Sequence, residues 1–436
     1  MKKAQLFLLI IGLCQLSVAQ KLPVEKLNEY FDVLDTNDKF MGTISIHKAG
    51  KSIYQKPVGF SNIETKTKAN PTSIYAIGSI SKSFTAVLIF QAIEKGQLSL
   101  DTKLSTYFPT LKNSEEITID HLISHRSGIP NYIKNDFSSW SSEAKSRAEL
   151  IKIIENEGSE FPPNSQTKYS NSNYVLLSYI LEIIHKKSFA EILDQQIVRP
   201  LHLKNTSLNK PKSNNLCYSY KFFDKWRVET NTAPENTLGA GGIWSTADNL
   251  NTFFQALSDG KLISKQNLEL MVPPKNQPIG KGLMRFYFHE HMGYGHTGGI
   301  DGFHAVSIYL PQEKTAVSIT ANGLNCVLNN ILINTLSAVF NKSFDIPDFK
   351  ITEYSSEELD KYLGVYSTSQ LPMKISITKK GTSLIAQATG QTAFELVGSA
   401  KHTFKFDAAN IVLVFDPDKR TLTLKQGGGV FVMNKE

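Results

Sequence analysis

Two pairs of strand-like segments lie at opposite ends of the first 340 residues, and their placement constrains the fold more than any other feature. Residues 42–48 and 51–58 alternate apolar and polar side chains around a short turn, and residues 303–310 and 314–321 do the same. Each pair predicts a β-hairpin. The region between them shows helical patterns rather than regular strand–helix alternation, which indicates an α+β fold. We therefore expect an antiparallel sheet that brings both ends of this region side by side, flanked by helices and a helical subdomain.

The strongest helical patterns lie close to these hairpins. Helices are expected at residues 24–36, 79–95 and 327–340. The second of these segments is strongly apolar and is followed by Gly96, a residue typical of helix C-termini. Farther along, Gly239–Gly242 predicts a glycine-rich turn, and Ser245–Asp248 predicts the start of another helix.

The chain changes pattern beyond residues 343–350, where Asp and Pro cluster. A short helix is expected within 355–364, and about eight short runs separated by turn signals follow at 363–367, 373–379, 383–389, 393–397, 402–406, 410–416, 421–426 and 429–433. Short strands at this spacing predict a small all-β barrel or sandwich. We place a domain boundary near residue 347, with a first domain at 20–346 and a second at 352–436.

The first 19 residues have the pattern of a signal peptide. Two lysines precede an apolar run at residues 4–16, and Ser17-Val18-Ala19 supplies the small side chains that signal peptidase requires. The run is too short to span the roughly 30 Å hydrocarbon core of a bilayer, which disfavours a membrane anchor. Bulky Leu13 before Cys14 disfavours a lipoprotein. We expect cleavage near Ala19 and an exported protein, periplasmic or extracellular.

Composition excludes two broad classes of protein. The chain has 436 residues with 20% charged and 10% aromatic side chains, a balance that excludes disorder over the whole chain. Its 47 Lys and Arg against 40 Asp and Glu give a net charge of +7, but the basic residues are scattered and form no long runs. We therefore expect no nucleic-acid partner.

Neither the cysteines nor the histidines indicate a metal. Beyond the signal segment the chain keeps Cys217 and Cys326 without a Cys-x-x-Cys zinc pattern, and two free buried thiols are expected rather than a disulfide. His289 and His291 flank Glu290, but this spacing differs from the helical His-Glu-x-x-His of zinc enzymes. A Gly-x-Ser-x-Gly turn and a phosphate-binding glycine loop are also missing from the sequence. We expect neither a metal nor a cofactor.

The strongest chemical signal is Ser79-Ile80-Ser81-Lys82, at the start of the apolar helix. The spacing places Lys82 about one helical turn from Ser79, where an amine can activate a hydroxyl that is otherwise a poor nucleophile. A helix N-terminus also favours the negative charge that develops there. Ser-x-x-Lys recurs, in less apolar surroundings or in strands, at Ser45, Ser142, Ser165, Ser207, Ser258 and Ser376. The alternative interpretation is an N-cap serine followed by a lysine that reaches the surface.

Two further motifs favour catalysis. Tyr169-Ser170-Asn171 is the only Tyr-x-Asn in the chain, and a tyrosine near a lysine can serve as general base beside an amide donor. Alone, this motif would also suit a turn in a Ser/Asn-rich loop. His296-Thr297-Gly298-Gly299 precedes a predicted strand, and its glycines allow close backbone approach. The Gly299 N–H is expected to pair with the Ser79 N–H as an oxyanion hole.

In this order the three motifs resemble those of the serine β-lactamase and penicillin-binding-protein superfamily. The likeness is to its class C-like branch of D-alanyl-D-alanine carboxypeptidases, D-aminopeptidases and related esterases. It covers about residues 25–340 and includes the stretches 119–132 and 239–250. The tail from about residue 352 resembles the lipocalin-like β-domain that is fused to some of these hydrolases. We expect this tail to carry no catalytic group and to shape the site mouth, mediate contacts or stabilise the chain.

The resemblance implies acyl transfer without a metal. Ser79 would attack a carbonyl, with Tyr169 and Lys82 sharing proton transfer, and which of these two is the base stays open. The substrate-binding residues that it implies are Asn171, His296, Thr297, Gly298 and Gly299.

His296 bears on the choice of substrate, because β-lactamases of this superfamily usually have lysine there. Histidine has an ordinary pKa of about 6.5 and is mostly neutral at pH 7. We therefore expect hydrolysis of D-amino-acid peptides or amides, peptidoglycan fragments among them, rather than rapid β-lactam turnover. The alternatives are an esterase or weak β-lactamase at the same site, or a non-catalytic penicillin- or peptidoglycan-binding protein.

Overall fold

The computed structural model describes residues 22–134, 141–208, 210–426 and 429–436. The predicted signal segment at 1–19 lies outside these residues. Within them, no helix combines the length and apolar character needed to cross a membrane.

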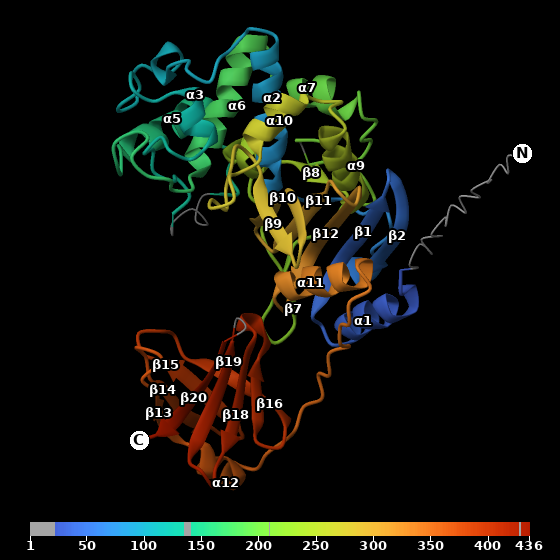
Figure 1. The fold of residues 1–436 in the computed structure, drawn as a ribbon, viewed down its shortest axis with the longest axis vertical. Helices are drawn as coiled ribbons and strands as arrows, with labels where there is room; N and C mark the ends of the chain where they lie inside the picture. The colour runs from blue at the N-terminus through green and yellow to red at the C-terminus, as the bar shows by residue number, and fades with distance from the viewer. Residues whose placement is uncertain (1–21, 135–140, 209, 427–428) are drawn as a thin grey trace, which may run out of the picture.

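A six-stranded antiparallel sheet forms the centre of the larger part of the molecule, in the order β2-β1-β12-β11-β10-β9 (Figure 1). Its strands are β1 (Phe40–Lys48), β2 (Lys51–Val58), β9 (Met284–Phe288), β10 (His291–Ile300), β11 (Phe303–Leu310) and β12 (Thr315–Leu324). Both predicted hairpins are confirmed, and β1 pairs with β12, so Ile44 lies opposite Ile319. The expected meeting of the two ends of this region is therefore observed.

Helices cover both faces of this sheet. Helix α1 (Val24–Thr36) and helix α11 (Leu328–Val339) pack on one face, where they share an apolar core with β1, β11 and β12. Helix α2 (Ser81–Glu94) and helix α9 (Ala247–Ser258) lie on the other side, in a larger apolar cluster (Figure 1). The three helices predicted near the hairpins are confirmed within two residues at each end, and Gly96 follows α2 with a φ of +68°.

A helical subdomain extends from α2 away from the sheet (Figure 1). Its elements are η2 (Leu104–Thr106), α3 (Ile119–Ile123), α5 (Arg147–Asn156), α6 (Asn171–His185), α7 (Phe189–Leu193) and the π-turn η3 (Asp194–Val198). The connection back to the sheet contains η4 (Pro234–Asn236), α8 (Leu238–Gly241) and α10 (Lys265–Met271). Three two-stranded ribbons join β3 (Phe60–Asn62) to β4 (Thr67–Lys68), β5 (Tyr75–Ala76) to β8 (Trp244–Ser245), and β6 (Tyr220–Phe222) to β7 (Trp226–Val228).

The glycine-rich segment Gly239–Gly242 differs from the expected turn. Most of it belongs to the short helix α8, because small side chains allow it to pack between α2 and α6. A Cβ on Gly239 would lie 2.1 Å from Thr85 Oγ1. The next helix, α9, begins at Ala247 as expected, and the Thr246 side chain caps it by accepting the Asn249 N–H.

The C-terminal part is a closed eight-stranded barrel. Of the two architectures that the sequence predicts for it, the barrel is therefore confirmed and the sandwich is not. It follows α12 (Ser356–Leu359) and η5 (Asp360–Tyr362) and includes η6 (Asp407–Ala409). Its strands are β13 (Gly364–Ser367), β14 (Ile375–Lys380), β15 (Ser383–Ala388), β16 (Phe394–Ala400), β17 (Thr403–Phe406), β18 (Ile411–Asp416), β19 (Thr421–Gln426) and β20 (Gly429–Lys435). Alternate side chains such as Leu384, Ala386 and Leu424 face a shared apolar interior. All eight predicted runs became strands because this alternation is a local property of the sequence.

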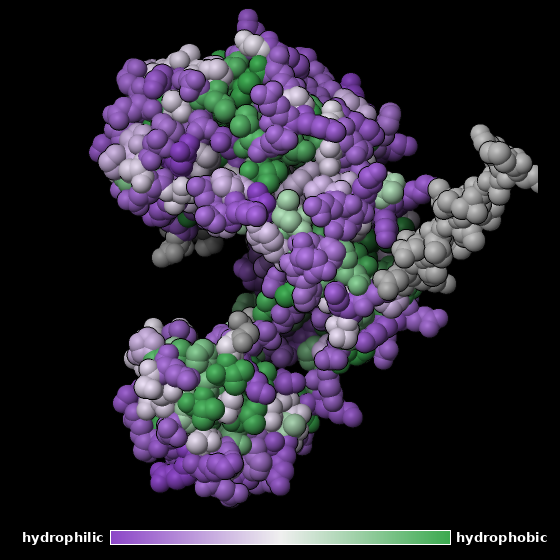
Figure 2. Space-filling model, viewed as in Figure 1, coloured by the Kyte–Doolittle hydropathy of each residue, from purple (hydrophilic) through white to green (hydrophobic). Residues whose placement is uncertain are grey.

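Residues 342–355, around the predicted boundary, contain neither helix nor strand. The barrel contacts the larger part near this connection, where Lys39 Nζ lies 2.7 Å from Asp407 Oδ2 and 4.8 Å from the centre of the Phe349 ring. The space-filling view shows the barrel as a separate lobe with a hollow beside it (Figure 2).

Candidate active site

Ser79 lies in the 3₁₀ turn η1 (Gly78–Ile80) that leads into α2. Residue Ile80 occupies the N-cap of α2, and no side chain caps either helix. The Ser79 hydroxyl is therefore free of the capping role that was its alternative interpretation. Gly78 adopts a φ of +51°, a conformation that glycine tolerates best, and this turns the chain directly before the serine.

Lys82 is fully buried, so it does not extend to the surface as the alternative interpretation required. Its Nζ lies 3.1 Å from Ser79 Oγ and hydrogen-bonds Asn171 Oδ1 at 2.7 Å and the Ala240 carbonyl oxygen at 2.6 Å. Burial holds the pKa of Lys82 well below its ordinary value. The helix α2 offers this amine no nearby carboxylate, which is why desolvation dominates.

Tyr169 and Asn171 flank Ser170, the N-cap of α6. Burial raises the pKa of the Tyr169 phenol to about 12, and its hydrogen bond with Ser79 offsets only part of that rise. The Lys82 Nζ lies 4.8 Å from the centre of the Tyr169 ring. The Asn171 Nδ2 donates to Asn131 Oδ1 at 3.1 Å, which orients the Asn171 carbonyl oxygen toward Lys82.

The motif His296–Gly299 belongs to strand β10, which packs its backbone against η1. A Cβ on Gly298 would lie 2.0 Å from the Ile77 carbonyl oxygen, and a Cβ on Gly78 would lie 2.6 Å from the Gly299 nitrogen. Only glycine permits this approach, which brings the backbone of Gly299 to the turn that carries Ser79. Thr297 is exposed, and its hydroxyl lies 3.7 Å from Met284 Sδ.

His296 is buried and neutral. Its Nδ1 lies 2.5 Å from the Thr297 carbonyl oxygen, which can only accept, so Nδ1 carries the proton. Burial, followed by the nearby charge of Lys82, lowers the pKa of His296 to about 4. The imidazole therefore supplies no positive charge at neutral pH.

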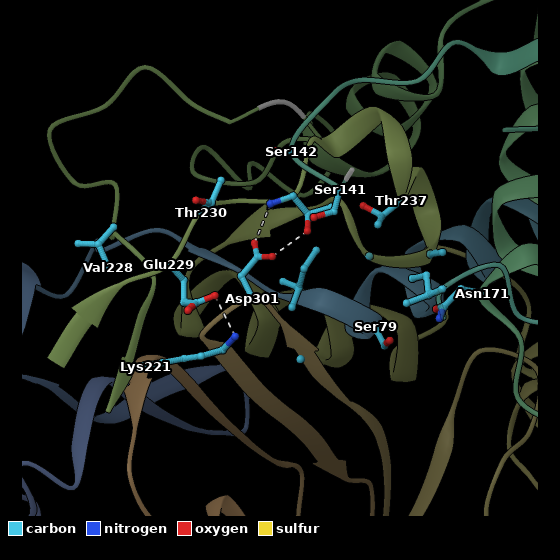
Figure 3. Close-up of a pocket in the computed structure, with 16 residues that line it drawn as sticks. Ser79, Ser141, Ser142, Asn171, Lys221, Val228, Glu229, Thr230, Thr237 and Asp301 are labelled. Carbon is cyan, nitrogen blue, oxygen red and sulfur yellow. Dashed lines mark hydrogen bonds and ion pairs between the residues drawn. The ribbon is translucent and has the colours of Figure 1, made fainter. Parts of the chain in front are cut away.

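A pocket of about 600 Å³ opens over Ser79, Asn171 and Gly299. Figure 3 shows Ser79 and Asn171 on one side of this pocket, with Asp301, Glu229 and Lys221 on the other. Within the described part of the chain, all the lining residues fall between Ser79 and Asp301, so the barrel contributes none. Lys82 is buried and Tyr169 is half-buried, and neither is among the residues that line the pocket.

Sequence reasoning missed two residues that help to build this site. His125 stacks on the Tyr169 ring and its Nδ1 accepts the Ser170 N–H at 3.1 Å. It lies in the stretch 119–132, whose resemblance to the superfamily assigns no role to any single residue. Asp301 lines the pocket from the turn after β10, and no sequence pattern marked it.

The two cysteines and the histidine pair of the sequence analysis can also be located in the structure. Cys217 is buried and Cys326 is half-buried, and both are free thiols. The His291 Nδ1 lies 2.6 Å from Glu313 Oε1. Within the described residues, His, Cys, Asp and Glu form no group of three that could hold a metal ion.

Three features of this site define the β-lactamase-like class of fold. A serine and a buried lysine lie at the start of one helix, a tyrosine and an asparagine lie at the start of another, and a strand packs two glycines against the serine turn. The chain belongs to the Beta-lactamase family, whose model matches residues 38–328. A penicillin-binding protein of Bacillus subtilis (strain 168) is 25% identical over 427 residues, which cover 89% of this chain and 93% of the relative.

Solved structures agree with this fold. The D-amino acid amidase of Ochrobactrum anthropi SV3, complexed with D-phenylalanine, superposes with a TM-score of 0.64 and 21% identity, covering 72% of this chain and 99% of the amidase. The octameric penicillin-binding protein homologue of Pyrococcus abyssi superposes with a TM-score of 0.69 and 22% identity, covering 94% of this chain and all of the homologue. The second match extends over the barrel as well as the larger part.

Proposed function

We propose that this protein is an exported serine hydrolase that cleaves amides or peptides of D-amino acids through an acyl-enzyme on Ser79. The observation that carries the proposal is the position of the fully buried Lys82 Nζ, 3.1 Å from Ser79 Oγ. Burial lowers the pKa of this amine, so more of it is neutral at pH 7, and only the neutral form has a lone pair that can accept the Ser79 proton. The predicted signal segment supports export, and the family supports hydrolysis.

Lys82 is the general base in this proposal, and Tyr169 is the general acid. A neutral amine has two N–H donors and one lone pair. The donors satisfy Asn171 Oδ1 and the Ala240 carbonyl, which leaves the lone pair for the Ser79 hydroxyl. With a pKa of about 12, the Tyr169 phenol keeps its proton at neutral pH and can donate it.

The reaction then proceeds in two steps. Lys82 takes the Ser79 proton as Oγ attacks the carbonyl carbon, and the Ser79 and Gly299 N–H groups stabilise the oxyanion. The carbon–nitrogen bond breaks as Tyr169 protonates the leaving amine. Water then attacks the acyl carbon and gives a proton to the Tyr169 phenolate. The bond to Oγ breaks, and Lys82 returns its proton to Ser79.

The neutral His296 supports amides or peptides of D-residues over β-lactams, because no cation stands at that position for a β-lactam carboxylate. The name of the structurally similar D-amino acid amidase supports the same class of substrate. The test measures turnover of a D-Ala-D-Ala peptide, a butyrate ester and a penicillin by wild type and by His296→Lys. We expect the wild type to hydrolyse the peptide or ester faster than the penicillin. Faster penicillin turnover than both would contradict the proposal.

A further inference from the structure

The charged side chains of the pocket are unevenly balanced. Lys221, Glu229 and Asp301 are the charged residues among the described ones that line it. Lys221 Nζ lies 2.8 Å from Glu229 Oε2, so these two charges neutralise each other. Asp301 forms no ion pair with any described residue of the pocket, and Figure 3 shows it between Glu229 and Ser79. The pocket therefore presents one uncompensated negative charge.

Asp301 is held in place without being neutralised. The Thr232 N–H donates to Asp301 Oδ2 at 3.0 Å, and the Thr232 hydroxyl donates to Oδ1 at 2.7 Å. A carboxylate has about four lone-pair sites, so both oxygens keep the capacity to accept further bonds. Burial raises the pKa of Asp301, as expected for a carboxylate that is partly removed from water without a cation beside it.

The turn that carries Asp301 is fixed relative to Ser79. Asp301 follows Gly299 by two residues, and Gly299 packs on the turn that bears the serine. The Gly302 N–H donates to Ser219 Oγ at 2.7 Å, which anchors the far side of this turn. A substrate whose carbonyl lies at Ser79 and Gly299 therefore shares its pocket with a preorganised carboxylate.

We infer that Asp301 binds a primary ammonium group of the substrate, so that this pocket takes D-aminoacyl amides or peptides with a free amino group. This inference rests on the proposed function and specifies its substrate class. A substrate recognised by its C-terminal carboxylate would meet Asp301 and Glu229, while Lys221 is already engaged and His296 is neutral. The structure thus favours an aminopeptidase or amidase over a carboxypeptidase.

The test uses four p-nitroanilides: D-alanyl and D-alanyl-D-alanyl, each with a free or an acetylated amino group. We expect the full-length wild type to prefer the free amine at one or both lengths, on the order of tenfold in kcat/KM, as for a hydrogen-bonded charge pair. The length that shows the preference locates the ammonium relative to the scissile carbonyl.

The Asp301→Asn variant separates recognition of charge from a structural role. Asparagine keeps an acceptor for Thr232 but removes the negative charge. We expect it to raise KM for the free amines while leaving kcat, the acetylated substrates and the melting temperature unchanged. The matched control is Asp416→Asn in the barrel, a carboxylate that also accepts a backbone N–H, from Lys419, and does not line the pocket; it should change none of these kinetic constants.

The outcomes distinguish this inference from the proposed function. A wild type that acetylation does not slow, or an Asp301→Asn variant that keeps the preference, overturns the inference alone if Ser79 is still labelled by a fluorophosphonate. An Asp301→Asn variant that loses activity equally on all four substrates, with a lower melting temperature, also overturns it, because Asp301 would then act only in folding. A wild type without labelling and without turnover overturns both.

Discussion

The imidazole of His125 stacks on the phenol of Tyr169, with the two ring centres 4.4 Å apart. The backbone on both sides of Tyr169 is bonded to the same residue, since Lys168 N donates to the His125 carbonyl at 2.9 Å and Ser170 N donates to its Nδ1 at 3.1 Å. Burial, reinforced by Lys82, holds the pKa of His125 well below its ordinary value, so the ring stays a neutral acceptor. His125 is therefore a positioning residue for Tyr169.

Replacing His125 with Phe keeps an aromatic face but removes the acceptor for the Ser170 N–H. A displacement of about 1 Å can cost roughly 100-fold in rate, so we expect kcat to fall by 10- to 100-fold with a smaller change in KM. The matched control is His289→Phe, because His289 is exposed and also has a positive φ. Steady-state kinetics and melting curves of both variants test this. An unchanged kcat in a folded His125→Phe protein would argue against the positioning role.

Tyr169→Phe distinguishes a general acid from a general base. If Tyr169 protonates the leaving group, acylation of the variant by an alkyl amide should slow roughly 100-fold or more. Acylation by a p-nitrophenyl ester, followed as the initial burst of nitrophenol release, should slow much less because that leaving group needs no proton. The ratio of the two rates, measured on one preparation, is the readout. An equal loss on both substrates would instead identify Tyr169 as the base that activates Ser79.

His296 should make the stability of the folded chain depend on pH in the acid range. The unfolded histidine takes up a proton as the pH falls through about 6.5, whereas the folded one does so only near its pKa of about 4. Stability is therefore lost as the pH falls from 6.5 to 4, by about 3 kcal/mol for this one group. His296→Gln keeps a donor for the Thr297 carbonyl oxygen but cannot take up a proton. Its free energy of unfolding should therefore fall less than that of the wild type between about pH 6.5 and 4. Urea unfolding of both proteins at several pH values measures the difference, and identical pH dependence would contradict it.

Removal of the barrel should leave the pocket intact. Truncation after residue 347 deletes every barrel strand but none of the described residues that line the pocket. We expect soluble protein that a fluorophosphonate still labels, with a small loss of stability because the Lys39–Asp407 ion pair is lost. The Lys39→Ala variant of the full chain measures how much stability the loss of this ion pair alone costs. Complete loss of soluble protein on truncation would indicate one integrated folding unit.

Local patterns in the sequence predicted much of this fold. The barrel strands and the two hairpins follow from alternation within a few residues, and α1 follows from its apolar periodicity. The segment Gly239–Gly242 was misjudged because its helical turn depends on packing against Thr85 and Phe189, which are distant in sequence. The sequence does not predict strand β10 either, since its glycines are unfavourable for a strand alone. Gly298 is required there by close contact with the backbone of Ile77 and Ser79.

The same distinction applies to the site. Ser79 and Lys82 lie one turn apart on the chain, so their proximity follows from spacing alone. The stacking of His125 on Tyr169 and the placement of Asp301 beside the pocket arise from segments that only the tertiary fold brings together. No periodicity or motif could have placed those two residues.

The central claim is that Ser79 alone is acylated, and peptide mapping after fluorophosphonate labelling tests it most directly. Ser142 provides an internal control, because it also lines the pocket, is exposed and begins a Ser-x-x-Lys sequence. We predict one labelled peptide, containing Ser79, in the wild type and in Ser142→Ala, and no label in Ser79→Ala. A label that persists in Ser79→Ala, on Ser142 or any other serine, would contradict the account.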